Sequence, residues 1–350
     1  MPDIITSYMG LKLNNPIIVG SCDFTGSVTG IIRCEDAGAG AVVLKSIFEE
    51  QFISKQNILD KDLSLHPEAV DYLRKGGLLE YAPQKMCQII TEAKKKTKIP
   101  IIASINCSSL KLWSSFAKQF QEAGADGLEL NIYFLPLELI TPGSKYEESY
   151  IKILREIKNT ISIPVAVKLS AQITSVPHLA HKLAESGCDA IVLFNWFLEP
   201  DIDTKQLKTR NIIGKGNFNQ SLRWVALLAD RIDCDLASSG GLKSGNDLIK
   251  QILAGASAVQ ASTLFYQKGL EAIKDIQSEL ESWMKEHRYN SIEDFRGELS
   301  FKKQDLSFKN MGEANAYFRA QYLKAYKIFD NFTPIKNNLH QKKNQQNKQD

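Results

Sequence analysis

The chain has 350 residues, of which 43% are hydrophobic and 24% are charged, and its formal net charge at pH 7 is +3. This composition is ordinary for a soluble globular protein, and so small a net charge gives no support for a nucleic-acid partner. No apolar stretch reaches the roughly 20 residues of a membrane-spanning helix, and no signal peptide opens the chain. We therefore expect a soluble, cytoplasmic protein without a membrane or nucleic-acid partner.

The cysteines and histidines give no sign of a metal centre. Six cysteines are scattered without paired spacing, and none clusters with the five histidines. Reduced thiols in a cytosolic protein are a better interpretation than a disulfide framework. His178 and His181 are three residues apart on a predicted helix, but no cysteine or aspartate lies beside them. We therefore predict no metal site.

One pattern occurs four times, with copies beginning at Asp36, Glu122, Glu185 and Leu253. Each copy has the end of a predicted helix, a glycine and then an apolar, mostly β-branched run. Glycine fits the left-handed position that ends a helix, and a run that is apolar on both faces suits a strand buried in a parallel sheet. The repetition predicts an α/β fold, a (β/α)8 TIM barrel, with its chemistry at the carboxyl ends of the strands.

In chain order, the first predicted element is a hairpin over 4–15, with Met9-Gly10 at its turn, which caps the bottom of the barrel. Strands are predicted over 17–22, 41–45, 100–106, 127–131, 164–169, 190–195, 235–238 and 258–261. Helices are predicted over 27–37, 83–97, 110–122, 146–160, 176–185, 220–230, 244–253 and 269–287. Long connections are expected over 46–81 and 196–218, with an insertion over 135–144.

The remainder of the chain is predicted to be an appendage. We expect the barrel to occupy residues 1–299 and a helical extension to occupy 300–335, with an aromatic-rich helix at 314–329. Such an aromatic stripe usually packs on its own domain or on a partner subunit. The polar segment 336–350 is predicted to be a disordered tail.

Polar residues stand at the carboxyl end of each predicted strand. In strand order they are Gly20-Ser21-Cys22, Lys45-Ser46, Ser104-Ile105-Asn106, Glu129-Leu130-Asn131, Lys168, Asn195, Ser238-Ser239-Gly240-Gly241 and Ala261-Ser262-Thr263. The last two groups present backbone N–H groups and hydroxyls to an anion, which predicts a phosphate site.

The other strand ends bring two lysines and three asparagines into one mouth. A buried lysine is costly unless it meets an anion. One interpretation is that Lys45 and Lys168 extend to solvent or pair with Glu129. The other is that a phosphorylated, electron-accepting ring lies across the barrel, with a lysine stabilising its reduced form.

An ordered set of short motifs carries a family resemblance from Asn14 to about Leu299. The motifs are Asn14-Asn15-Pro16-Ile17-Ile18, Val42-Val43-Leu44-Lys45-Ser46, Leu130-Asn131, Val167-Lys168-Leu169, Ser239-Gly240-Gly241-Leu242, Val259-Gln260-Ala261-Ser262-Thr263 and Ser291-Ile292-Glu293-Asp294-Phe295-Arg296-Gly297. The chain resembles the flavin-dependent dihydroorotate dehydrogenase family, particularly its soluble members. The resemblance implies bound FMN, a homodimer, and hydride transfer between flavin N5 and a small cyclic substrate, dihydroorotate by default.

The resemblance also implies roles for particular residues. Lys45 and Lys168 would lie at the catalytic ring edge. The implied FMN contacts are Gly20, Ser21, Lys45, Ser46, Asn106, Asn131, Lys168, Asn195 and Gly216, and the implied phosphate ligands are Gly240, Gly241, Ser262 and Thr263.

The sequence departs from the family in the substrate half. The family has an Asn-Leu-Ser-Cys-Pro-Asn segment after strand four, in which the cysteine, or a serine in membrane-bound relatives, is the general base. Here Phe134 takes the base position and Pro136 takes that of a substrate-binding asparagine. Trp196 replaces a small hydroxyl residue after strand six. A Gly-Leu-Pro-Asn motif expected after strand two is replaced by the sequence 76–81.

Loss of a general base costs roughly 10²–10⁴-fold in rate, so the substrate and the chemistry both stay open. Tyr133, Cys107 or Glu80 could move the proton, and Tyr133 is nearest in sequence, although a tyrosine that packs the lid is the more favoured interpretation of it. The alternatives to dihydroorotate are another unsaturated ring or enone, or a non-catalytic barrel that binds flavin or phosphate. A phosphosugar lyase or isomerase is less favoured. The electron acceptor, whether fumarate, NAD through a partner subunit, or quinone, is not predicted.

Overall fold

The computed structural model describes residues 2–48, 83–107, 110–196, 198–213, 216–304 and 311–329. The chain divides into two compact units, residues 1–305 and 306–350. Most of the predicted connection over 46–81 and the whole predicted tail over 336–350 lie outside the described residues.

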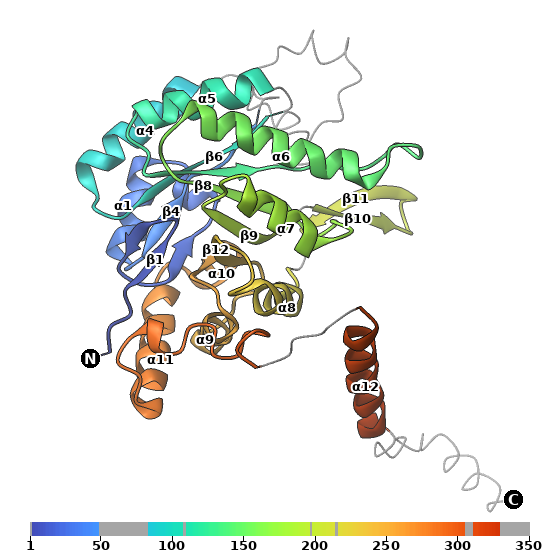
Figure 1. Cartoon of the computed structure of the whole chain (residues 1–350). Helices are drawn as coiled ribbons and strands as arrows, with labels where there is room; N and C mark the ends of the chain where they lie inside the picture. Colours follow the sequence, from blue (N-terminus) through green and yellow to red (C-terminus); the bar gives the residue numbers. More distant parts are fainter. Residues whose placement is uncertain are drawn as a thin grey trace, which may run out of the picture. The chain divides into compact units, whose positions relative to one another are not determined.

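Parallel strands close into a barrel in the first unit (Figure 1), which confirms the predicted TIM-barrel class. The strands are β3 (Ile17–Val19), β4 (Ala41–Val43), β5 (Ile47–Phe48), β6 (Ile101–Asn106), β7 (Gly127–Asn131), β8 (Val165–Ser170), β9 (Ala190–Asn195), β12 (Asp235–Ser239) and β13 (Ala258–Ala261). β4 and β5 pair with successive parts of β6, so they are two segments of one strand position. The pairing of β4 with β6 closes the ring.

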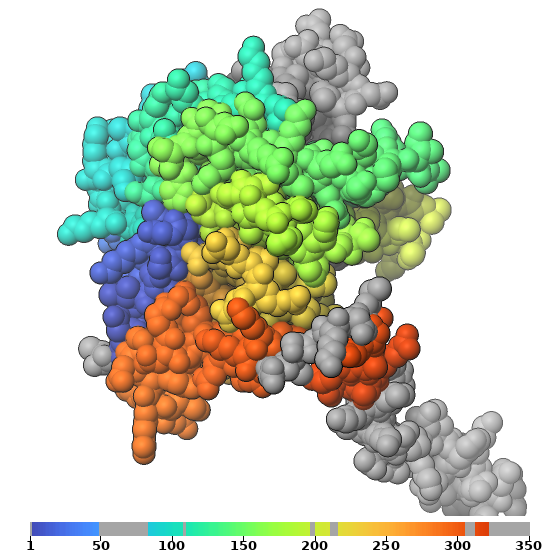
Figure 2. All heavy atoms as spheres, in the orientation of Figure 1, coloured from blue at the N-terminus to red at the C-terminus, as the bar shows by residue number. Residues whose placement is uncertain are grey.

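Helices alternate with these strands and surround them. They are α1 (Val28–Asp36), α4 (Pro83–Lys96), α5 (Leu110–Glu122), α6 (Gly143–Thr160), α7 (Val176–Glu185), α8 (Phe218–Leu228), α9 (Gly245–Ala254), α10 (Thr263–Lys268) and α11 (Ala272–His287). In the space-filling view the side chains of α4 to α7 cover one side of the barrel (Figure 2). The strands beneath them are buried on both faces, as their apolar sequences require.

The N-terminal hairpin consists of β1 (Thr6–Tyr8) and β2 (Leu11–Leu13), joined at Met9-Gly10 as predicted. Tyr8, Met9 and Leu13 are buried and pack with inward-facing strand residues such as Ala166 and Val192. The hairpin thus fills the amino end of the barrel, and the carboxyl ends of the strands, here called the mouth, lie at the opposite end.

One predicted connection was wrong, and one helix was not predicted. The connection over 196–218 contains an antiparallel hairpin, β10 (Leu198–Asp203) and β11 (Lys208–Ile213), in which Arg210 pairs with Asp201. The predicted helix over 269–287 is α11, but α10, which precedes it, was not predicted; Gly269, with a φ of +80°, ends α10. Glycine adopts a positive φ at little cost in conformational energy, so the chain can turn at Gly269.

The second unit contains α12 (Met311–Phe329), which includes the aromatic-rich helix predicted at 314–329. Across the described parts of both units, no helix combines the length and the apolar character needed to cross a membrane.

Candidate active site

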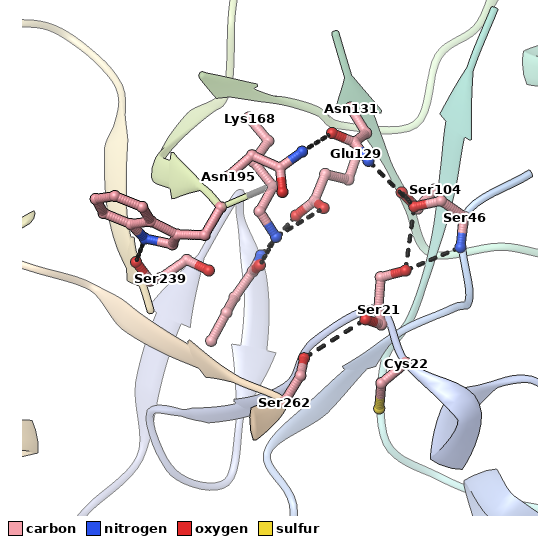
Figure 3. A network of polar contacts seen from close by, with 12 residues as sticks. Ser21, Cys22, Ser46, Ser104, Glu129, Asn131, Lys168, Asn195, Ser239 and Ser262 are labelled. Carbon is pink, nitrogen blue, oxygen red and sulfur yellow. Dashed lines mark hydrogen bonds and ion pairs between the residues drawn. The ribbon is translucent and has the colours of Figure 1, made fainter. Parts of the chain in front are cut away.

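A chain of hydrogen bonds links five strand ends at the mouth of the barrel (Figure 3). The Ser46 hydroxyl lies 3.1 Å from the Ser21 hydroxyl and 2.7 Å from that of Ser104. Asn131 Nδ2 donates to Ser46 Oγ at 3.4 Å, and Asn195 Nδ2 donates to Asn131 Oδ1. The structure therefore brings together hydroxyls and amides that lie up to 174 positions apart (195 − 21) in the sequence.

Below this chain, Lys168 lies in a ring of three buried polar side chains. Its Nζ is 3.5 Å from Glu129 Oε1 and donates to Gln260 Oε1 at 2.9 Å. Gln260 Nε2 completes the ring by donating to Glu129 Oε2 at 2.6 Å. Glu129 and Gln260 are each 1% exposed and Lys168 is 7% exposed. The pairing with Glu129 is the alternative that the sequence left open for Lys168, and it offsets the cost of burying the ammonium group.

Lys45 has a different environment. Its ammonium pairs with Asp23, and the two side chains are 31% and 70% exposed, so this pair lies where water screens it. Asp23 belongs to a short 3-10 turn, η1 (Asp23–Thr25), that follows β3. The sequence did not predict this partner, because the direction of a turn residue is not set by strand periodicity.

Three glycines form a close-packed surface where β12 ends. Gly240 and Gly241 have φ of +92° and +82°, and a Cβ at Gly216 would lie 2.9 Å from Gly241 N. The N–H groups of Gly240 and Gly241 donate no hydrogen bond within the part of the chain that the structure describes. Successive free N–H groups in this conformation form a concave site for an anion.

The hydroxyl residues of the predicted phosphate site lie beside the end of β3. Ser262 Oγ is 3.5 Å from the backbone oxygen of Ser21, and a Cβ at Gly20 would lie 2.8 Å from Ser262 Oγ. Thr263 follows as the first residue of α10. The residues predicted for the phosphate thus border the residues predicted for the ring.

The mouth therefore fits the FMN that the resemblance implies. Asn106, at the end of β6, is 7% exposed, and its Nδ2 has no hydrogen-bond partner among the described residues. A buried donor without a partner is costly, and a ring carbonyl would satisfy it. The free N–H groups of Gly240 and Gly241 would suit the phosphate in the same way.

The position expected for a general base packs against α6. Phe134 packs edge-on against Tyr150 of α6, with ring centroids 5.5 Å apart, and also contacts Tyr146 at 6.2 Å. The Tyr150 hydroxyl donates to the backbone oxygen of Ile132 at 3.0 Å, which fixes the segment after β7 on the helix. Residue 134 is thus part of the contact between this segment and α6.

Of the replacement groups predicted for proton transfer, Tyr133 is half-buried, and burial raises the pKa of its hydroxyl. Cys107 is buried at the end of β6. Glu80 and the rest of the sequence 76–81 lie outside the described residues, as do Gly214 and Lys215 beside Gly216.

A cavity of about 640 Å³ lies at the opposite, amino end of the barrel, with Met9 and Asp235 among its lining residues. Asp235 is already satisfied there, because it accepts hydrogen bonds from Met9 N and from Ser257 Oγ. Arg296 on the same wall pairs with Glu293. The chemistry expected at the carboxyl ends of the strands remains in the mouth.

The fold and the polar mouth place the chain among TIM-barrel proteins with a site built at the strand ends. The sequence model of the family described as dihydroorotate dehydrogenase matches residues 4–284, and the chain belongs to this family. The prediction of an oxidoreductase that acts on CH–CH bonds is confirmed at this level.

Several curated proteins are similar over most of this chain. The catalytic subunit of dihydroorotate dehydrogenase B (NAD(+)) from Thermoplasma acidophilum is 28% identical over 312 residues, which cover 85% of this chain and 99% of the relative. The protein of the same name from Methanocaldococcus jannaschii is 26% identical, covering 80% of this chain and 93% of the relative. The chloroplastic dihydropyrimidine dehydrogenase (NADP(+)) of Arabidopsis thaliana is 24% identical, covering 85% and 76%.

Proposed function

We propose that the chain binds FMN across the mouth of the barrel and transfers hydride between flavin N5 and a small cyclic substrate. The observation that carries the proposal is the set of donors at the strand ends, which comprises the buried Asn106 amide, the Lys168 ammonium and the two free glycine N–H groups. The bound flavin would supply a two-electron acceptor.

We propose a different role for each residue of the mouth, according to its position. Lys168 would face the edge of the ring where negative charge develops on reduction, and Glu129 with Gln260 would hold its ammonium there. Lys45 would act at the rim, and Ser46, Asn131 and Asn195 would orient the ring and substrate by hydrogen bonds. The remaining contacts proposed for FMN are Gly20, Ser21, Gly216, Gly240, Gly241, Ser262 and Thr263.

Tyr133 is our proposed proton-transfer group. Phe134 has no group that can accept a proton, and Tyr133 is the neighbouring residue with one. Because burial raises the pKa of Tyr133, its hydroxyl stays protonated at neutral pH and is suited to donate a proton. A hydride and a proton would add to the two carbons of a C=C bond, and the tyrosinate would regain its proton from water.

This direction of proton transfer favours a second candidate, a reductase of an unsaturated ring, over dihydroorotate oxidation in pyrimidine biosynthesis. One relative is named a dihydropyrimidine dehydrogenase, which makes a pyrimidine ring the first substrate class to test. Dihydroorotate is the first candidate for the reverse direction, by the names of the other relatives.

For the assembly we propose a homodimer with a separate electron-transfer subunit that uses NAD. The second subunit is supported by the names of the relatives, which are catalytic subunits of NAD(+) enzymes, and the homodimer follows from the family resemblance alone. The six cysteines all lie among the described residues and none forms a disulfide, which suits the reducing conditions of the cytoplasm.

The test is an anaerobic titration of the FMN-loaded protein. Dihydroorotate or dihydrouracil is added to the oxidised form, and orotate or uracil to the chemically reduced form, while the flavin absorbance is followed. Loss of absorbance with dihydroorotate would establish the family's named reaction. Rapid reoxidation by a pyrimidine, without bleaching by either dihydro compound, would establish the reductase. A flavin that responds to none of them would reject both substrates.

Substitution of Tyr133 by Phe tests the proton-transfer role. The ring stays and the hydroxyl goes, so we expect the turnover rate to fall roughly 10²–10⁴-fold while the affinity for FMN stays unchanged. Unchanged turnover in the Tyr133→Phe variant would remove this residue from the mechanism.

A further inference from the structure

Trp196 is the first residue after β9, and its indole reaches Ser239, the last residue of β12. The indole Nε1–H donates a hydrogen bond to the backbone oxygen of Ser239 at 3.1 Å. The next residue, Gly240, has a φ of +92°, and a Cβ built there would lie 2.2 Å from the indole Nε1. The indole therefore holds the Ser239 carbonyl and occupies the space that a side chain at position 240 would need.

The same loop is enclosed on another side by the backbone that leads into α8. A Cβ at Gly241 would lie 2.9 Å from Phe218 N, and a Cβ at Gly216 would lie 2.9 Å from Gly241 N. Both distances are shorter than any ordinary Cβ contact, so the backbone of Gly241 is in direct contact with the backbone of residues 216–218. The loop after β12 is thus clamped between the indole and residues 216–218.

The hydrogen bond to Ser239 has a consequence for the next N–H group. A trans peptide unit is planar, with its C=O and N–H pointing in opposite directions. Because Trp196 holds the Ser239 carbonyl, the N–H of Gly240 in the same peptide unit must point away from the indole. This N–H and that of Gly241 are the donors that form no hydrogen bond within the described part of the chain.

We propose that Trp196 is a positioning residue for phosphate, and that its indole N–H, by holding the Ser239 carbonyl, keeps the Gly240 N–H turned toward the phosphate of FMN. The inference deepens the proposed function and rests on it. Trp196 acts through the loop and not on the reacting atoms, so its effect should be confined to the phosphate end of the ligand.

Two other roles are open to an indole at a flavin site, and both predict a different result. Stacking on the ring system would affect every flavin equally, and a purely structural role would affect the stability of the fold and not the choice of ligand. Riboflavin separates these cases, because it has the ring system of FMN and lacks the phosphate.

The experiment measures dissociation constants of FMN and of riboflavin for the wild type and for Trp196→Phe. The substitution keeps an aromatic ring and removes the N–H donor. Loss of one neutral hydrogen bond predicts FMN binding about three- to tenfold weaker. Riboflavin binding should be unchanged. Trp224→Phe, in the half-buried tryptophan of α8, is the matched control and should change neither constant.

Equal weakening of FMN and riboflavin, or an unchanged FMN constant, would overturn the role of Trp196. A parallel measurement without flavin uses inorganic phosphate, which should raise the melting temperature of the wild type more than that of Trp196→Phe. Phosphate could raise the melting temperature of the wild type more than that of Trp196→Phe although the wild type binds neither FMN nor riboflavin. The proposed flavin function would then be wrong, and the role of Trp196 in phosphate binding would be supported. If the wild type responds to neither phosphate nor flavin, both are wrong.

Discussion

Glu129 is the residue on which the buried ring around Lys168 depends most. Its carboxylate is 1% exposed and contacts both Lys168 and Gln260. Glu129→Gln would leave the ammonium of Lys168 buried without a counter-charge, so we expect the free energy of unfolding to fall by about 3 kcal/mol. Urea unfolding of the cofactor-free protein measures this. The matched control is Glu185→Gln, because Glu185 is exposed and its ion pairs lie at the surface. We expect no change in the free energy of unfolding of this variant. Equal urea midpoints for Glu129→Gln and the wild type would show that the pair contributes nothing.

At the residue scale, the sequence predicted which side chains meet but not all of their partners. The convergence of Ser46, Asn131 and Asn195 followed from their places at strand ends. Gln260 was missed as a partner of Lys168, although a glutamine inside an apolar buried strand was a signal that could have been used. Asp23 could not be predicted, because its pairing with Lys45 depends on how a turn folds back over the mouth.

At the element scale, the segment after β7 is held against α6 by Phe134 and Tyr150. Restoring the base of the family by Phe134→Cys should therefore not increase dihydroorotate oxidation, because a side chain at this position points to the helix. The variant should instead lower the free energy of unfolding, by roughly 1–3 kcal/mol, through lost aromatic contact. Steady-state oxidation of dihydroorotate and urea unfolding check the two parts. A large gain in rate would show that residue 134 reaches the substrate.

Strong periodicity made most elements predictable. The bounds of α5, β7, α7, β9 and β13 are those predicted, since each combines a clear apolar pattern with a glycine or polar boundary. The hairpin of β10 and β11 was missed because its charged residues, including Asp201 and Arg210, resemble a loop when their cross-strand pairing is unknown. The six residues of α10 are too few to show a helical period.

At the scale of the whole molecule, buried thiols predict how stability depends on pH. Burial raises the pKa of Cys34 and of Cys188 to about 12. An exposed thiol in the unfolded chain titrates near 8.5. Below that pH the two thiols are protonated in both the folded and the unfolded chain, and their contribution to the free energy of unfolding is fully present. Between about pH 9 and 12 only the unfolded chain loses these protons, so stability falls as the pH rises.

For Cys34 alone the expected loss between pH 8 and pH 10.5 is about 2.5 kcal/mol. Urea midpoints across this range measure it, and Cys34→Ala supplies the comparison, because other groups titrate equally in both proteins. The variant should lose stability less steeply with pH. Parallel slopes for the two proteins would show that the thiol does not titrate differently on unfolding.

The central claim is that the mouth of this barrel holds FMN. The most direct measurement is the visible spectrum of the purified protein after incubation with FMN and removal of the free ligand, with protein concentration determined independently. The account predicts one bound FMN per chain for the wild type and for the surface control Glu185→Gln. A protein that stays colourless while folded would contradict it.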